Sequence, residues 1–188
     1  MIAVAFIRHA PTAWNAEHRL QGRTDMPLSE SGRATAATWR LPEAFAGYEA
    51  WASPLTRTRE TASLLGLRPK FDDRLIETSW GEWEGHTLAR LRERPGFLEV
   101  EKRGLDLAAP GGESVRQVQV RLLDWLSGLT KPAVVVTHNG VLRAVYALAT
   151  GWTMQDKPPE RMEAAMAHVY VWDGKRLILD KLNLPLVP

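Results

Sequence analysis

Four basic side chains follow apolar runs that are predicted to be β-strands. Arg8 and His9 come directly after an N-terminal apolar run, and His138 follows a second, valine-rich run. Arg57 lies in the first turn of a helix predicted behind a third, shorter strand. In an open α/β sheet, ligands bind beyond the carboxyl ends of the strands. We therefore expect these four side chains to converge at one edge of the sheet.

Two guanidinium groups with no acidic cluster nearby favour an oxyanion over a metal ion as the ligand. The paired N–H groups of a guanidinium match the geometry of a phosphate, and helix N-termini after residues 53 and 139 would add backbone donors. A neutral imidazole is a competent nucleophile, and adjacent cations favour its neutral form. The pattern predicts phosphoryl chemistry with neither a metal nor a cofactor.

The surrounding pattern alternates strands with helices. Residues 2–7 and 132–137 are continuous apolar runs, typical of strands buried on both faces. Helices are predicted to open at Ser29, over 55–65 with Ser53 as the cap, near 87–93, at the capping box that starts at Ser114, and over 141–149 with Gly151 behind it. Asp173-Gly174 predicts a hairpin between 167–172 and 176–180.

These elements predict an α/β fold in which a mostly parallel sheet is covered by helices on both faces. We expect a three-layer α/β/α sandwich whose C-terminal hairpin adds an antiparallel edge. Residues 78–112 form too long a stretch for a simple connection, so we expect a small lid or insertion there. The whole chain, residues 1–188, is predicted to be one domain.

Composition excludes several other classes of protein. The chain has 188 residues, a net charge of +2 and no cysteine, which removes disulfides, thiolate metal sites and cysteine nucleophiles. Its balanced charge gives no basic face for nucleic acid. No window reaches the roughly 20 apolar residues of a membrane helix, and the N-terminus lacks the pattern of a signal peptide. We expect a cytoplasmic protein, either monomer or homodimer, with no nucleic-acid or membrane partner.

Six motifs in order resemble those of the histidine phosphatase superfamily, whose members are phosphoglycerate mutase-like. They are Arg8–Asn15 (RHAPTAWN), Asp25–Gly32 (DMPLSESG), Ser53–Ala62 (SPLTRTRETA), Glu77–Gly85 (ETSWGEWEG), Pro110–Ser114 (PGGES) and Val136–Gly140 (VTHNG). Two departures are Ala10 in place of glycine and Thr58 in place of alanine. Because alanine is close to glycine in size, we expect crowding at Ala10 rather than loss of activity.

The resemblance implies catalytic roles for five residues. His9 would be phosphorylated during turnover, while Arg8, Arg57 and His138 would bind the phosphoryl oxygens. Glu77 matches the family's general acid, which protonates the leaving oxygen and later activates water. Two further carboxylates nearby, Glu82 and Glu84, compete with Glu77 for this role.

Further residues are expected at the substrate. Asn15 resembles a phosphate-contacting asparagine of the family, Gln21 and Gly22 lie in a loop that can approach the ester, and Asn139 would contribute its backbone N–H. The sequence leaves the roles of Glu113, His18 and His86 open, between the site and the solvated surface.

The leading functional hypothesis is a metal-independent phosphomonoesterase acting on a small phosphorylated metabolite. RHAPT together with PGGES resembles the α-ribazole phosphatase branch, so α-ribazole 5′-phosphate is one candidate substrate beside broad specificity. The first alternative is a cofactor-dependent phosphoglycerate mutase, although mutases of this family carry a longer insertion between the acid and the second histidine. The second is a catalytically silent phosphate-binding module, which would be expected to lose His9 or His138.

Overall fold

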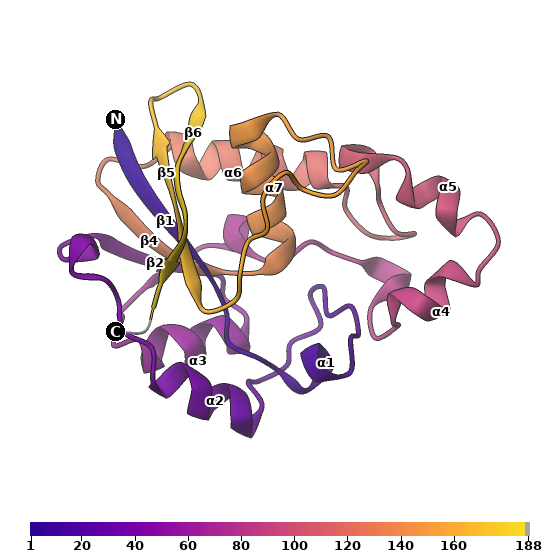
Figure 1. Cartoon of the computed structure of the whole chain (residues 1–188), viewed down its shortest axis with the longest axis horizontal. Helices are drawn as coiled ribbons and strands as arrows, with labels where there is room; N and C mark the ends of the chain where they lie inside the picture. Colours follow the sequence, from indigo (N-terminus) through magenta and orange to yellow (C-terminus); the bar gives the residue numbers. More distant parts are fainter. Residues whose placement is uncertain (187–188) are drawn as a thin grey trace.

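The computed structural model describes residues 1–186, and within them six strands form one sheet in the order β3-β2-β4-β1-β5-β6 (Figure 1). The strands are β1 (Ile2–Arg8), β2 (Glu49–Ala52), β3 (Lys70–Phe71), β4 (Ala133–Thr137), β5 (Met166–Trp172) and β6 (Leu177–Pro185). The first four run parallel to one another, and β5 pairs antiparallel with both β1 and β6. The mostly parallel sheet with an antiparallel edge hairpin is confirmed.

Alternate residues of the central strands face two separate cores. Val4 and Phe6 of β1 pack against residues 115–126 and 141–145 on one face of the sheet. Ala5 and Ile7 pack on the opposite face with Trp39, which follows the helix over residues 30–37. Because both faces are covered, the central strands lack a polar side, which explains their uninterrupted apolar runs. The predicted three-layer α/β/α arrangement is therefore confirmed.

The longer helices supply the two outer layers. The α-helices are α1 (Ala13–Ala16), α2 (Glu30–Ala37), α3 (Thr56–Leu64), α4 (Leu88–Arg92), α5 (Phe97–Glu101), α6 (Val115–Ser127) and α7 (Asn139–Thr150). Helices α6 and α7 cover one face, and α2 and α3 cover the other. The predicted caps Ser29 and Ser114 each accept a hydrogen bond from a first-turn backbone N–H, as does Thr87 at the start of α4, and Gly151 ends α7 with φ +75°.

Helix α3 lies within one residue of the predicted range 55–65, but its predicted cap is wrong. Its N-cap is Leu55, with no side-chain cap, and Ser53 lies before the helix. The backbone N–H and hydroxyl of Thr56 instead donate to the carboxylate of Asp25, each at 2.8 Å. A distant acidic side chain thus satisfies the helix N-terminus. The hydroxyl of Thr58, where the family has alanine, lies 2.8 Å from the carbonyl oxygen of Ser53.

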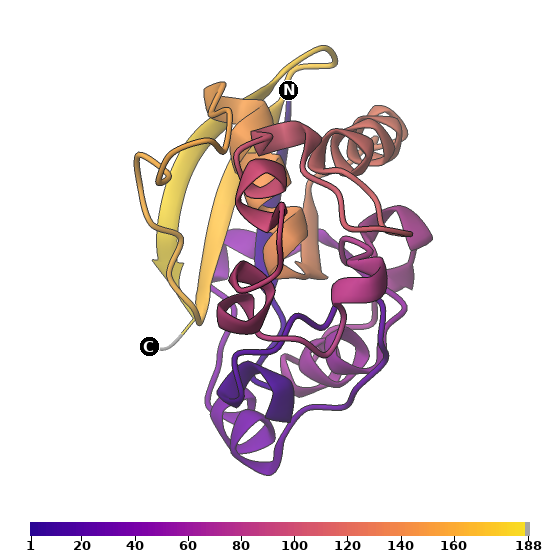
Figure 2. The ribbon, with the colours of Figure 1, turned by 90° about the vertical axis from the view of Figure 1, so that its right-hand side faces the viewer.

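Residues 78–112 contain α4, α5 and two 3₁₀ turns, η3 (Gly81–Trp83) and η4 (Gly104–Asp106). They have a core of their own, in which Trp83, Leu91, Phe97 and Ala109 are buried. Figure 2 shows α4 and α5 facing the viewer, and Figure 1 shows them at one end of the long axis, away from α2 and α3. None of the helices described in residues 1–186 is both long and apolar enough to cross a membrane.

Candidate active site

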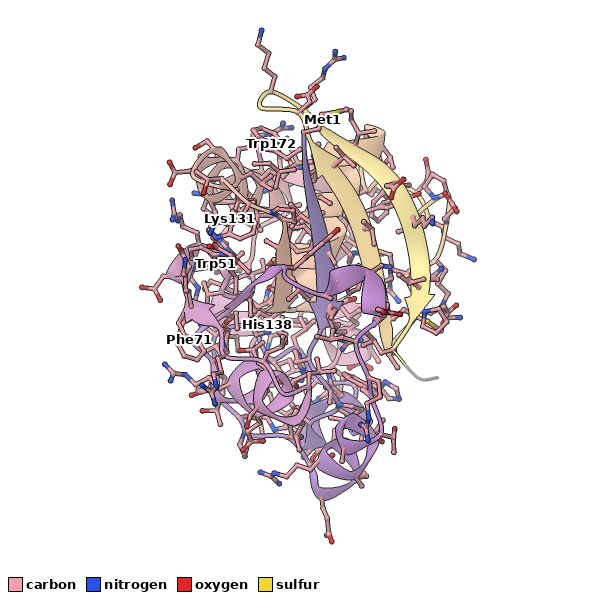
Figure 3. All side chains as sticks on the ribbon, turned by 90° about the vertical axis from the view of Figure 1, so that its left-hand side faces the viewer. Met1, Trp51, Phe71, Lys131, His138 and Trp172 are labelled. Carbon is pink, nitrogen blue, oxygen red and sulfur yellow. The ribbon has the colours of Figure 1, made fainter. Side chains whose placement is uncertain are left out.

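Strands β1 and β4 bring the two histidines together, because they run side by side in parallel and both end at the same edge. Arg8 pairs with Thr137 in the sheet, and the backbone N–H of His9 donates to the Thr137 carbonyl at 2.9 Å. The rings of His9 and His138 are then 5.3 Å apart, edge to face. Figure 3 shows His138 at the opposite end of the sheet from Met1. The two histidines that were predicted to converge therefore lie together at this edge of the sheet.

His9 is held in one tautomer by its own neighbour. Its Nδ1 lies 2.7 Å from the carbonyl oxygen of Ala10, which can only accept a hydrogen bond, so Nδ1 carries the proton and Nε2 keeps its lone pair. Burial and the charges of Arg8 and Arg57 lower the pKa of His9 well below its usual range. The ring is therefore neutral at pH 7, as a nucleophile requires.

Ala10 fits this position without the glycine of the family. Its backbone φ lies outside the positive region, and its N–H donates to the Thr61 hydroxyl at 3.0 Å. The side chain is buried in the core on the α2 side of the sheet. An alanine here needs no unusual backbone, so the substitution leaves the His9 backbone in ordinary geometry.

Arg57 is buried, and three of its five N–H groups donate to protein atoms. Its two terminal nitrogens donate to the carbonyls of Gly22 (2.7 Å) and Thr24 (3.0 Å), and its Nε donates to Nδ1 of His138 (3.2 Å). These bonds tie the loop of residues 21–24 to helix α3. Arg8 differs, because its Nε is buried and finds no hydrogen-bond partner within residues 1–186. Arg8 thus brings an unsatisfied donor to the site, which an oxyanion can satisfy.

His138 lies behind Arg57 rather than on the cavity wall. Because Nδ1 accepts from Arg57, Nε2 carries the proton and donates to the Ser53 hydroxyl at 2.7 Å. Burial and the charge of Arg57 lower the pKa of His138 well below its usual range, so the ring is neutral. Both nitrogens are occupied in this arrangement, and the predicted contact of His138 with phosphoryl oxygens stays a prediction.

Glu77 is a buried carboxyl held at the N-terminus of α7. One oxygen accepts from the backbone N–H of Thr78 at 2.7 Å, and the other accepts from that of Gly140 at 3.1 Å. A side chain at Gly140 would place its Cβ 2.4 Å from a Glu77 oxygen, so this approach requires glycine. Burial raises the pKa of Glu77, although the two N–H bonds and the charges of Arg57 and Arg8 oppose the rise.

One cavity of about 660 Å³ contains most of the predicted residues. Its lining includes Arg8, His9, Asn15, Gln21, Gly22, Arg57, Glu77, Asn139 and Gly140. The side-chain oxygen of Asn15 accepts from Thr12 in a capping box, which leaves the amide nitrogen to donate to a ligand. Asn139 opens α7 directly after its N-cap, His138, so its backbone N–H is at the helix N-terminus, as predicted.

Glu84 has a supporting role that the motif alone did not reveal. Its carboxylate accepts from the backbone N–H groups of Arg23, Thr24 and Trp80, and from the Thr24 hydroxyl at 2.6 Å. It therefore fixes the same loop whose carbonyls hold Arg57. Its rival Glu82 is exposed and does not line the cavity. The signal available in the sequence was the glycine at position 22, where a Cβ would meet the Glu84 carboxylate at 2.0 Å.

The residues whose roles were left open lie outside the cavity lining. Glu113 accepts from the backbone N–H of Ser79 and pairs with Arg121 and Arg23. The ring of His86 meets Arg94 on the exposed surface, and His18 is an exposed loop residue with φ +55°. Glu113 thus braces the chain two residues beyond Glu77, and neither histidine reaches His9. Within residues 1–186 no group of three His, Asp or Glu side chains is arranged to hold a metal ion.

Trp80 and Trp83 supply the apolar part of the wall. Their rings stack with centroids 6.2 Å apart, and Trp83 also packs against Phe97 at 4.8 Å. All three line the cavity that contains His9. The site can therefore offer a cationic end to a phosphoryl group and an aromatic wall to the rest of an ester.

Curated relatives of this chain include both phosphatases and a mutase. A glucosyl-3-phosphoglycerate phosphatase from Mycolicibacterium vanbaalenii is 30% identical, covering 82% of this chain and 77% of its own. A 2,3-bisphosphoglycerate-dependent phosphoglycerate mutase 2 from Gloeobacter violaceus is 31% identical over 77% and 74% of the two chains. Phosphoserine phosphatase 1 from Hydrogenobacter thermophilus is 28% identical over 98% and 93%.

Solved structures and a family profile agree with these matches. A protein from Thermus thermophilus has a TM-score of 0.78 at 34% identity, covering 97% of this chain and 100% of its own. A mycobacterial glucosyl-3-phosphoglycerate phosphatase solved with VO3 has a TM-score of 0.80 at 28% identity, covering 98% and 100%. The profile of the histidine phosphatase superfamily (branch 1) matches residues 4–185. The chain therefore belongs to the histidine phosphatase superfamily.

Proposed function

We propose that this protein is a metal-independent phosphomonoesterase that hydrolyses a small phosphorylated metabolite through a phosphohistidine on His9. The observation that carries the proposal is the environment of Nε2 of His9. This nitrogen is unprotonated because Nδ1 donates to Ala10, and its ring shares a cavity with Arg8, Arg57 and the buried Glu77. A neutral nucleophile, fixed cations and a carboxyl with a raised pKa are the groups that phosphoryl transfer needs.

The first step would transfer the phosphoryl group to the enzyme. The lone pair of His9 Nε2 forms a bond to phosphorus while the bond from phosphorus to the ester oxygen breaks. Glu77, whose pKa is raised by burial, would give a proton to the departing oxygen, so an alcohol leaves. Arg8 and Arg57 offset the charge that spreads over the phosphoryl oxygens.

The second step would return the enzyme to its starting state. Glu77, now ionised, accepts a proton from a water molecule as the water oxygen attacks phosphorus. The bond between Nε2 and phosphorus breaks, inorganic phosphate leaves, and Glu77 is again protonated. Asn15 and the backbone N–H of Asn139 are the additional donors that we assign to phosphoryl oxygens, with Gln21 and Gly22 beside the ester.

A trapping experiment tests this proposal directly. The protein is mixed with a ³²P-labelled ester and quenched within milliseconds, and we expect an acid-labile, base-stable label on the wild type and none on His9→Ala. Release of phosphate from an aryl phosphate should be abolished in the same variant. Activity of His9→Ala within tenfold of the wild type would overturn the assignment. A chelator is expected to leave turnover unchanged, and a loss restored by a divalent ion would point to a metal mechanism.

The mutase relative from Gloeobacter violaceus makes phosphoglycerate mutase the second candidate. A mutase must return the phosphoryl group to a second hydroxyl rather than to water. A substrate panel that includes α-ribazole 5′-phosphate and 3-phosphoglycerate distinguishes the two. Free phosphate as the product supports hydrolysis, whereas conversion of 3-phosphoglycerate to its 2-phospho isomer, stimulated by a bisphosphate, supports a mutase.

A further inference from the structure

The cavity is much larger than the end that contains His9. Its volume of about 660 Å³ is in the range that accommodates a whole small metabolite. Trp80, Trp83 and Phe97 line it with aromatic surface, and helix α7 contributes Arg143. Figure 2 shows α7 together with the α4–α5 segment on the side of the molecule that faces the viewer. The alcohol half of an ester would meet these groups.

Arg143 differs from Arg19 and Arg92, two other arginines of the cavity, because it has no carboxylate partner within residues 1–186. Arg92 is paired with Glu101 at 2.5 Å, and Arg19 is paired with Glu17 at 2.5 Å. Burial lowers the pKa of Arg143, and within residues 1–186 no carboxylate opposes that effect. A guanidinium that is partly removed from water and lacks an anion is costly, and an anionic ligand would offset the cost.

The position of Arg143 is fixed before any ligand arrives. Its guanidinium lies over the ring of Trp152, 4.8 Å from the centroid. That ring is itself held, because its Nε1 donates to the Asp156 carbonyl at 3.1 Å and it packs edge to face against Tyr146. A cation–π contact of this kind leaves guanidinium N–H groups available for hydrogen bonds to a ligand.

Helix geometry relates Arg143 to the phosphoryl end. Asn139 and Arg143 are four residues apart on α7, so they lie on the same helix face, about 6 Å apart along the axis. Both line the cavity. A ligand with one oxyanion at the N-terminus of α7 can therefore place a second about one helical turn farther on.

We propose that Arg143 forms a second oxyanion subsite and that the substrate is a phosphomonoester whose alcohol carries a carboxylate or a second phosphate. This inference rests on the proposed function, because it assigns the first oxyanion to the phosphoryl group at His9. A guanidinium edge binds either group through paired, charge-assisted hydrogen bonds. The aromatic wall of Trp80 and Trp83 would contact the carbon skeleton between the two anions.

Binding of phosphonates, which cannot be hydrolysed, tests the subsite independently of turnover. Calorimetry would compare the dissociation constants of 3- and 4-phosphonobenzoate and 1,4-phenylenediphosphonate with that of 4-carbamoylphenylphosphonate. In the last compound a neutral amide replaces the carboxylate of 4-phosphonobenzoate. We expect the wild type to bind at least one ligand with two anionic groups tenfold more tightly than the carbamoyl ligand, whose only anionic group is the phosphonate. The carboxylate and diphosphonate arms separate the two sources of the second charge.

Variants assign the preference to Arg143. Arg143→Met should reduce the preference to about onefold, and Arg143→Lys, which keeps a cation over Trp152 but loses the paired donors, should reduce it at least threefold. The matched control is Arg92→Met, which removes a cavity arginine already paired with Glu101 and should keep the preference. Melting curves verify that each variant is folded.

The outcomes separate the two proposals. Equal binding of all phosphonates to the wild type, or a preference that survives in both Arg143 variants, would overturn the subsite even if aryl phosphates are hydrolysed. A preference that disappears with Arg143 supports the subsite even if no ester is hydrolysed, in which case the proposed function alone is wrong.

Discussion

His9 and Glu77 share one cavity, yet their pKa values shift in opposite directions. The pKa of His9 falls because burial and two arginines disfavour its charge, and the pKa of Glu77 rises because burial disfavours its charge. The two shifts favour the neutral imidazole and the protonated carboxyl, which are the forms that the proposed first step needs. Such a divergence is what distinguishes a nucleophile from a general acid at one site.

The pH dependence of turnover follows from these directions. For an alkyl phosphate, kcat/KM should rise as His9 loses its proton, below the usual histidine range, and should fall as Glu77 ionises, above its usual range. In Glu77→Gln the descending limb should disappear, because no proton remains to be lost at that position. Steady-state rates of both proteins from pH 4 to 9 check this, and an unchanged limb in the variant would assign it to another group.

Glu77→Gln should also slow esters with poor leaving groups far more than esters with good ones. An alkoxide needs a proton as it departs, so the rate on an alkyl phosphate should fall by about 10² to 10⁴, the usual contribution of general acid catalysis. A nitrophenolate leaves without a proton, so the same variant should lose far less on 4-nitrophenyl phosphate. The ratio of kcat values on the two esters is the measurement. Equal losses would assign a structural role to Glu77.

Helices and loops set where these groups stand, and the loop of residues 21–24 depends on Glu84. Glu84→Ala should remove four hydrogen bonds at once, including those from the backbone N–H groups of Arg23 and Thr24. We expect the free energy of unfolding to fall by about 2 kcal/mol and activity to fall at least tenfold, because the loop carbonyls no longer hold Arg57.

Glu82→Ala is the matched control for this element. Glu82 is two residues away, exposed and outside the cavity lining, so its removal should change the free energy of unfolding by no more than about 0.5 kcal/mol. Urea denaturation and turnover of both variants are compared with the wild type. Similar losses in the two variants would mean that the effect is general to this segment rather than specific to the loop contacts.

Strands and helices with a strong local signal could be predicted from the sequence. Strands β1 and β4 are uninterrupted apolar runs, and the caps at Ser29 and Ser114 are local signals, so their ends were predicted closely. The cap of α3 was predicted wrongly because its N-terminus is satisfied by Asp25, 31 residues earlier in the chain. Strand β3 is two exposed residues and leaves no periodicity to detect.

At the site, residue types at strand ends were enough to predict that His9, His138, Arg8 and Arg57 gather. The hydrogen bonds that orient them were beyond a local pattern. Ser53 was predicted as a helix cap, but it meets His138 because β2 and β4 lie side by side. The tautomer of His138 and the bracing of loop 21–24 by Glu84 depend in the same way on contacts between distant segments, whereas the tautomer of His9 is set by the adjacent Ala10.

At the scale of the whole molecule, the two-sided sheet excludes water from polar groups as well as apolar ones. His168 of β5 lies opposite Phe6 of β1, and its Nε2 is buried without a hydrogen-bond partner within residues 1–186. Its Nδ1 accepts from the backbone N–H of Asn183 at 3.4 Å. Burial lowers the pKa of His168 to about 4, so this ring stays neutral in the fold at a pH where an exposed histidine is charged.

His168 should therefore make the fold sensitive to acid. Between about pH 6.5 and 4, His168 is protonated in the unfolded chain but stays neutral in the native state. The free energy of unfolding therefore decreases as the pH falls through this range. From pH 7 to 5 the wild type should lose about 2 kcal/mol more unfolding free energy than His168→Gln, which cannot take up the proton. Urea denaturation at both pH values measures the difference. Equal acid losses in the wild type and His168→Gln would show that the His168 ring is hydrated in the native state.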